Sequence, residues 1–185
     1  KEQRTVEAVR LAEWYHGCDE GRLLVDFSLH AEYTNVPKAC EYVAELAKRF
    51  KTGMQIHLSE TEREHLECMD RWGKTPTEFF RDTGVLDVPT TAAHCVWVTD
   101  SDIEILRDKG VTVAHNPVSN LKLGSGVAPL RKLLDAGVEH FVFDVRNNPG
   151  GDLQSIVAVL SYFLDEGDMV ISAIDKDENV AGTYT

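Results

Sequence analysis

Short apolar stretches alternate with amphipathic stretches along most of the chain, and this alternation limits the fold more than any other feature. The apolar stretches have the length and composition of β-strands, and segments with a helical period separate them. The predicted strands cover residues 22–29, 54–58, 90–96, 111–115, 139–145 and 169–174. The predicted helices cover residues 2–16, 37–50, 61–72, 75–84, 100–109, 128–136 and 152–165. Such alternation implies parallel strands joined by right-handed crossovers.

The length of the chain limits how complete this architecture is. A chain of 185 residues forms one domain, or one domain with an appendage. A complete eight-stranded α/β barrel typically needs about 250 residues. We therefore predict an α/β fold, with a mainly parallel sheet and flanking helices, that resembles a partial TIM-type barrel. An open sheet, or a barrel completed by another copy, are the alternatives.

Composition excludes some classes of partner. The net formal charge of -12 argues against nucleic acid, which binds clustered Lys and Arg side chains. No apolar run is long enough to span a membrane, and the charged start of the chain predicts that it carries no signal peptide. The four cysteines are widely spaced and form no CxxC pair, which predicts free thiols and a cytoplasmic location.

A histidine lies near the end of the second predicted strand. In the strand over residues 54–58, Gln55 and His57 share one face, and Glu60 follows just past the strand end. Neutral imidazole is a good ligand for zinc or iron, and a nearby carboxylate can transfer a proton to a substrate. The alternative is a buried polar pair in which Glu60 caps the following helix.

Three further strand ends carry polar residues. His94 ends a strand of small residues that leave room for a ligand, although it could equally be a core histidine. The segment that starts with His115 and Asn116 is a polar loop, whose side chains could bind a substrate or only satisfy the loop's own backbone. His30 lies at the end of the first strand, where the alternative is surface packing. Because ligands gather at the carboxyl ends of parallel strands, the four together predict a site.

These strand ends also carry a family resemblance. The segments are His-Ala-Glu-Tyr-Thr at 30–34, Ile-His-Leu-Ser-Glu-Thr at 56–61, Ala-His-Cys at 93–95 and His-Asn-Pro-Val-Ser-Asn-Leu-Lys-Leu-Gly-Ser-Gly at 115–126. Over about residues 7–138 the chain resembles metal-dependent amidohydrolases. The branch it most resembles contains the S-adenosylhomocysteine and methylthioadenosine deaminases and the related chlorohydrolases.

The resemblance implies a role for each of these side chains. His57 would be a ligand of a divalent zinc or iron ion, and Glu60 the proton shuttle to a purine-like ring. His94 would orient or activate the metal-bound water. The pocket for a small-molecule substrate would include His30, His115 and Asn116. The implied reaction is attack of metal-bound hydroxide on an amidine-like carbon, with release of ammonia.

The sequence departs from the family pattern at two other metal ligands. The family has a His-x-His pair on the first strand, and no such pair occurs in this chain. A further ligand is an Asp at the end of the last strand, for which Asp144 is the candidate metal ligand here. Asp144 falls about one residue from the expected place, and a shift of one residue reverses the face of a strand.

The end of the chain resembles a different family. Residues 143–153, Phe-Asp-Val-Arg-Asn-Asn-Pro-Gly-Gly-Asp-Leu, resemble the carboxyl-terminal processing serine peptidases, over about residues 140–185. The resemblance places the nucleophilic Ser and its Lys partner beyond the end of this chain, so peptidase activity is not expected. We predict a hybrid or truncated chain: an amidohydrolase-like part at 1–138, and a strand–turn–helix–strand at 139–185 packed into the same domain.

The functional prediction from sequence is a metal-dependent hydrolase of the deaminase type whose activity is lost or incomplete. The alternative is a non-catalytic chimeric or engineered α/β scaffold. A partial barrel would expose apolar strand edges, so we also predict self-association into a homo-oligomer.

Overall fold

A computed structural model of the protein describes residues 2–137, 142, 153–161, 164–176 and 179–184. The chain divides into two compact units, Lys1–Glu139 and His140–Thr185. The first unit holds all four segments that resemble amidohydrolases. None of the helices in the described ranges is long and apolar enough to cross a membrane.

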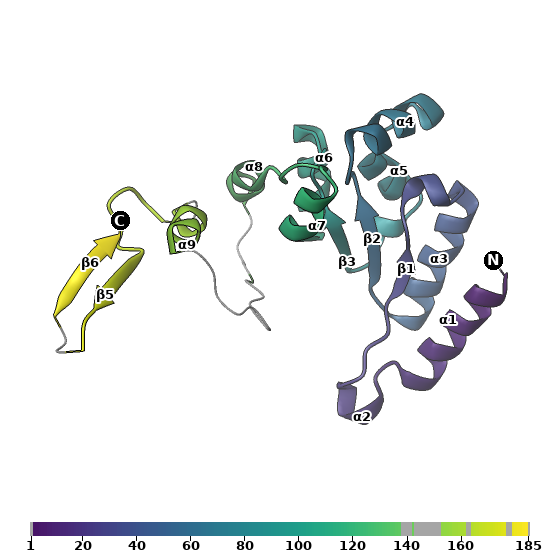
Figure 1. Cartoon of the computed structure of the whole chain (residues 1–185). Coiled ribbons are helices and arrows are strands. Elements are labelled where there is room, and N and C mark those ends of the chain that lie inside the picture. The colour runs from purple at the N-terminus through teal and green to yellow at the C-terminus, as the bar shows by residue number, and fades with distance from the viewer. Residues whose placement is uncertain (1, 138–141, 143–152, 162–163, 177–178, 185) are drawn as a thin grey trace. The chain divides into compact units, whose positions relative to one another are not determined.

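A four-stranded parallel sheet forms the centre of the first unit. Its strands are β1 (Phe27–Leu29), β2 (Met54–Leu58), β3 (Thr90–His94) and β4 (Thr112–Ala114). They pair in the order β1-β2-β3-β4, which is also their order in the chain. Helical connections join them, as Figure 1 shows. The predicted α/β class with a parallel sheet is therefore confirmed.

The helices of the first unit begin where the sequence carries start signals. They are α1 (Glu2–Tyr15), α2 (Cys18–Gly21), α3 (Pro37–Phe50), α4 (Glu62–Trp72), α5 (Pro76–Asp82), α6 (Asp100–Asp108), α7 (Pro117–Lys122) and α8 (Leu130–Asp135), with 3-10 turns η1 (Glu32–Thr34) and η2 (Val85–Asp87). The hydroxyls of Thr61, Thr75 and Thr99 accept hydrogen bonds from the first turns of α4, α5 and α6. Each hydroxyl satisfies a backbone N–H that has no partner within the helix.

The segment after β4 differs from its prediction. The sequence predicted a long polar loop over residues 116–126, whereas Pro117–Lys122 form helix α7. Pro117 occupies the first helical turn, where its missing N–H does no harm. The N–H of Asn120 donates to the carbonyl of Asn116 at 2.9 Å and closes the first turn. The prediction of a loop was therefore wrong for residues 117–122, whose polar composition does not distinguish a loop from a short exposed helix.

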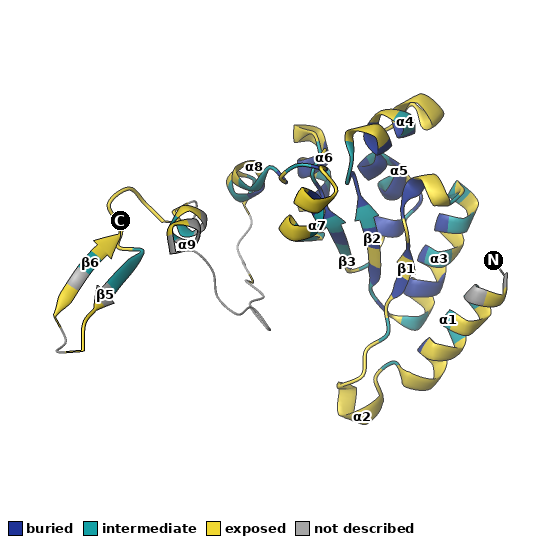
Figure 2. Ribbon diagram, in the orientation of Figure 1, coloured by how far each residue is buried: buried dark blue, intermediate teal, exposed yellow. Residues whose placement is uncertain are grey.

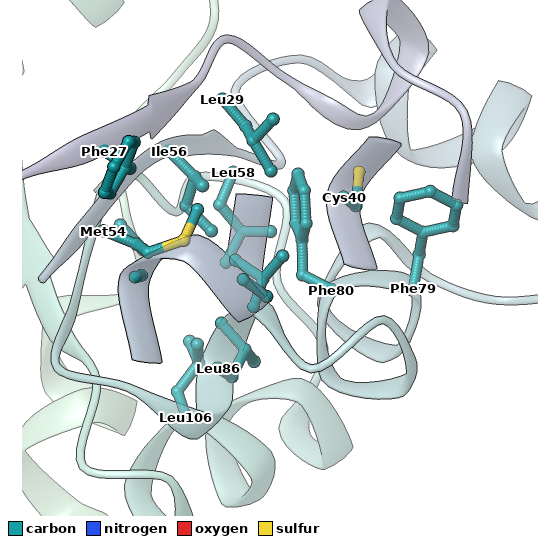
Figure 3. Close-up of a cluster of buried hydrophobic side chains, with 14 of the residues drawn as sticks. Phe27, Leu29, Cys40, Met54, Ile56, Leu58, Phe79, Phe80, Leu86 and Leu106 are labelled. Atoms are coloured by element: carbon teal, nitrogen blue, oxygen red, sulfur yellow. The ribbon is translucent and has the colours of Figure 1, made fainter. Parts of the chain in front are cut away.

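The hydrophobic core lies between the sheet and its helices. On β2, the side chains of Met54, Ile56 and Leu58 are buried, while Gln55 on the other face is exposed. The buried side chains join Phe80 of α5 and others in one cluster (Figure 3). Figure 2 shows buried residues concentrated where the strands meet the helices. The apolar face of β2 therefore packs into the core, on the opposite side of the strand from Gln55.

The second unit contains one described helix and a hairpin. Helix α9 spans Leu153–Leu160, and β5 (Ile171–Ile174) pairs antiparallel with β6 (Val180–Tyr184). The predicted strand over 139–145, and with it the candidate metal ligand Asp144, lies outside the described residues. The packing of this segment into one domain with residues 1–138 stays a prediction.

Loss of a core aromatic side chain should destabilise the first unit strongly. Phe80 is fully buried, and its ring lies 5.5 Å from that of Phe79. Phe80→Ala should lower the free energy of unfolding by about 3–5 kcal/mol, because it leaves a cavity. Leu66→Ala, at an exposed position of α4, serves as control and should cost less than about 1 kcal/mol. Urea titration followed by circular dichroism would measure both, and equal losses would contradict this packing.

Candidate functional site

Four histidines lie at the carboxyl ends of the four parallel strands. His30 follows β1, His57 lies in β2, His94 ends β3 and His115 follows β4. The ring centroids of His30 and His57 are 4.8 Å apart, and those of His57 and His94 are 5.3 Å apart. Burial, and then the neighbouring charge of His94, lower the pKa of His115 below 6.5. The structure thus brings the predicted strand ends together at one edge of the sheet.

The imidazole of His57 is held by the backbone of the neighbouring strand end. Its Nδ1 lies 2.7 Å from the carbonyl oxygen of His30, which also accepts the N–H of His57 at 3.0 Å. Because a carbonyl oxygen only accepts, Nδ1 must carry the proton and Nε2 keeps a lone pair. Histidines that bind metals are oriented in the same way, with the second ring nitrogen donating to a carbonyl or carboxylate.

His94 is buried beside a carboxylate and an amide. Its Nδ1 lies 2.7 Å from Oδ1 of Asn120 and 3.7 Å from Oε1 of Glu60. Glu60 is partly exposed, whereas His94 is 5% exposed. The carboxylate of Glu60 therefore reaches solvent while it stays close to the imidazole, where it could exchange protons with a bound molecule.

The backbone at these strand ends adopts a conformation that side chains disfavour. The φ angles are 45° at Ser59, 74° at His94 and 49° at Cys95, all in the left-handed region. Hydrogen bonds hold this turn: Cys95 N–H donates to the carbonyl of Leu58 at 2.9 Å, and Val96 N–H to that of Ser59 at 3.1 Å. Strained backbone of this kind gathers at functional sites. Nothing in the sequence indicates this conformation, since Ser59, His94 and Cys95 are not glycines.

Glu64 of α4 orders the turn that carries Glu60. Its two carboxyl oxygens accept the N–H of Ser59 at 3.1 Å and that of Glu60 at 2.8 Å. Burial raises the pKa of Glu64 to about 7, although these hydrogen bonds oppose the rise. Sequence reasoning saw only an acidic first turn of a helix here and missed the role of Glu64 in placing Glu60.

The predicted pocket residues occupy different surroundings. His30 is exposed and packs edge-on against the ring of Tyr33, whose hydroxyl lies 3.4 Å from Nε2 of His30. His115 and Asn116 are half-buried at the end of β4 and the start of α7. Whether they contact a substrate stays a prediction.

The donor atoms fit a metal ion only in part. His57 offers Nε2, and so does His94 when Nδ1 donates to Asn120. Within the described ranges, however, no group of three or more His, Cys, Asp or Glu side chains could hold a metal ion. The first unit therefore presents imidazoles suited to one side of a zinc site, without a complete set of ligands.

The opposite end of the sheet carries two hollows. Two hollows of about 340 and about 420 Å³ lie beside the amino ends of the strands, with Pro89 and Gly110 in both. In α/β barrels the amino end serves stability and the carboxyl end serves function. The chemistry of the side chains, rather than the hollows, locates the candidate site.

Comparison with known families decides what this arrangement is. The sequence model described as the amidohydrolase family matches residues 1–173. The chain belongs to the amidohydrolase family. It is 44% identical over 137 residues to a 5-methylthioadenosine/S-adenosylhomocysteine deaminase of Caldanaerobacter subterraneus subsp. tengcongensis, which covers 74% of this chain and 32% of the relative. It is 42% identical over 132 residues to a 5'-deoxyadenosine deaminase of Methanosarcina mazei, covering 71% of this chain and 31% of that protein.

Solved structures agree with these relatives. A zinc-bound adenosine deaminase from Xanthomonas campestris superposes with a TM-score of 0.69 at 28% identity, over 74% of this chain and 31% of that one. A zinc complex of atrazine chlorohydrolase from Arthrobacter aurescens gives a TM-score of 0.66 at 25% identity, over 72% of this chain and 29% of that one. This amidohydrolase chain thus spans about a third of the length of the relatives it matches.

The comparisons treat the end of the chain differently from the sequence prediction. The amidohydrolase match runs to residue 173, well into the segment that resembles processing peptidases. The comparisons give no support to the peptidase resemblance. The hybrid origin of the chain therefore stays a prediction.

The raised pKa of Glu64 should appear in the pH dependence of stability. The folded state keeps a proton that the unfolded state, with an ordinary pKa of 4.5, loses between pH 4.5 and about 7. Stability from this group therefore falls as the pH rises through that window. Gln cannot titrate, so the free energy of unfolding of Glu64→Gln relative to that of the wild type should rise as the pH increases from about 5 to about 8. Urea titrations across this range would measure the change.

Glu67 on the same helix is the matched control for this titration. Hydrogen bonding to Arg63, and the charges of Arg63 and Arg71, lower the pKa of Glu67. It is therefore ionised in both states above about pH 5.5, and from there to about pH 8 Glu67→Gln should show no pH-dependent change relative to wild type. Parallel pH profiles for the two variants would contradict the burial of Glu64.

Proposed function

We propose that this chain provides the His57, Glu60 and His94 part of the active site of a metal-dependent deaminase acting on a purine-like small molecule. The observation that carries the proposal is the placement of the three side chains. The rings of His57 and His94 are 5.3 Å apart, and a carboxyl oxygen of Glu60 lies 3.7 Å from Nδ1 of His94. The names of the relatives, among them adenosine and methylthioadenosine deaminases, support the substrate class.

Each side chain has a contact that suits its proposed role. The proton on Nδ1 of His57 is fixed by the carbonyl of His30, so Nε2 is free to bind a divalent zinc or iron ion. A bound ion of this kind polarises water and lowers its pKa toward neutrality. With such an ion in place, His94 would orient the water, and Glu60 would carry a proton to a ring nitrogen of the substrate. The overall reaction replaces an exocyclic amino group by oxygen and releases ammonia.

A second candidate function rests on the ligand set. The described residues offer no cluster of three metal-binding side chains, and the sequence contains no His-x-His pair. A non-catalytic α/β scaffold that keeps the architecture of its family would show the same histidines without the chemistry.

Zinc binding separates the two candidates. Elemental analysis and competition against a chelating dye should show stoichiometric zinc in the wild type. His57→Ala should weaken zinc binding by more than about tenfold. Removal of a residue that only hydrogen-bonds to a metal ligand already costs about that much, and removal of the ligand itself should cost more. His16→Ala is the control, since His16 lies at the amino end of the strands and accepts the N–H of Val25. A folded, metal-free wild type would favour the scaffold.

Ammonia release tests the proton shuttle directly. With adenosine, methylthioadenosine or S-adenosylhomocysteine, Glu60→Gln should lower kcat by at least about 100-fold, the scale of general acid–base catalysis. Glu62→Gln, at an exposed position two residues along, should leave kcat unchanged. No ammonia release by the zinc-loaded wild type, or equal rates in the two variants, would overturn the proposal.

We also propose that the chain self-associates and works in the cytoplasm. β1 and β4 are the edges of the described sheet, and unpaired strand edges favour association. Exposed apolar side chains such as Val118 and Leu121 of α7 add to this tendency. Size-exclusion chromatography with light scattering should show dimers or larger species, and a stable monomer would contradict self-association. The scattered cysteines, without a CxxC pair, support the cytoplasmic location.

A further inference from the structure

Asn120 is the side chain in the described structure that makes the shortest polar contact with the imidazole of His94. It is the fourth residue of α7 and is fully buried. Its Oδ1 lies 2.7 Å from Nδ1 of His94, a full ångström closer than the carboxyl oxygen of Glu60. We propose that Asn120 is a positioning residue, which holds His94 in the tautomer with the proton on Nδ1 and the lone pair on Nε2.

The chemistry of the amide determines the tautomer. An amide oxygen has lone pairs and no proton, so it can only accept a hydrogen bond. The proton in the contact must therefore belong to Nδ1 of His94. A neutral imidazole carries a single N–H, which leaves Nε2 as the acceptor. A base that orients water needs that lone pair. The role of Asn120 therefore rests on the proposed function, to which it adds the tautomer of His94.

The position of Asn120 is itself fixed from both sides. Its carbonyl accepts the N–H of Ser125 at 2.8 Å, and the carbonyl of Ser125 accepts the indole N–H of Trp97 at 2.9 Å. Trp97 belongs to the turn that follows β3, three residues after His94. These hydrogen bonds thus link the segment after β4 to the turn that follows His94.

Gly126 allows this close approach. Its φ is 113°, and an added Cβ would lie 3.1 Å from Cγ1 of Val96. A larger residue would therefore separate the segment after β4 from the turn after β3. The close approach at Gly126 thus keeps the segment that contains Asn120 against the turn that follows His94.

The contact also frees Glu60 for another role. Without Asn120, the carboxylate of Glu60 would be the nearest acceptor for the Nδ1 proton of His94. A charge-assisted hydrogen bond between them would draw the carboxylate inward. The amide satisfies that proton and leaves the carboxylate of Glu60 available to a bound molecule.

The amide nitrogen of Asn120 argues against a role in packing alone. Its Nδ2 is buried and has no hydrogen-bond partner in the described part of the chain. An unsatisfied buried donor costs about 1–3 kcal/mol, a cost that an apolar side chain of similar size would not carry. The contact of Oδ1 with His94 is the interaction that explains an amide at this position.

The tautomer of His94 can be measured without metal or substrate. Long-range ¹H–¹⁵N correlation spectra of the metal-free chain, recorded at about pH 8 where free imidazole is neutral, distinguish a protonated Nδ1 from a protonated Nε2. The His94→Gln spectrum assigns the signal. The wild type should show the Nδ1-protonated form, and Asn120→Ala and Asn120→Leu should shift His94 toward the Nε2-protonated form that free imidazole prefers.

Two further variants and a binding measurement complete the test. Asn120→Asp keeps an acceptor and should keep the wild-type tautomer, while Ser119→Ala on the same helix should change nothing. Zinc affinity should be the same in Asn120→Leu and Asn120→Asp as in the wild type, because the proposed ligand is His57, which the carbonyl of His30 orients, and Asn120 contacts only His94. An Nε2-protonated His94 in the wild type, or an unchanged tautomer in the folded Asn120→Leu variant, would overturn this proposal.

The two proposals fail in different ways. A wild type with the expected tautomer that binds no zinc would refute the proposed metal site and leave the role of Asn120 intact. A zinc-binding, ammonia-releasing wild type with the Nε2-protonated tautomer would refute the role of Asn120 and leave the deaminase intact.

Discussion

The parallel pairing of β2 with β3 is the constraint on which the candidate site depends. The register sets Leu58 opposite His94, and the pairing continues past the strands through the hydrogen bond from Cys95 to Leu58. This continuation forces the backbone of Ser59 and His94 into the left-handed region. Without the pairing, the rings of His57 and His94 would not share one edge of the sheet.

A second layer of polar contacts fixes the direction of each functional side chain. The carbonyl of His30 orients His57, the amide of Asn120 contacts His94, and the carboxylate of Glu64 holds the turn that carries Glu60. Precise placement of this kind is what catalytic geometry requires.

Membership of the amidohydrolase family explains the sequential strand order and the histidines at the strand ends. It also explains why the described residues offer an incomplete set of metal ligands. A metal site in a barrel draws ligands from several strands around the ring, and this chain spans about a third of the length of its relatives. The described sheet contributes one arc of such a ring.

The sequence by itself determined the fold class, the course of the parallel sheet and the position of His57, Glu60 and His94 at or just past strand ends, because periodicity and strand-end position are local properties. It misjudged the segment that contains α7, because polar composition favours both loops and exposed helices. It missed Glu64 and Asn120, whose partners lie across a turn or on another strand. Only the tertiary structure decided which ring nitrogen and which carboxylate are free, because that depends on contacts between residues far apart in the chain.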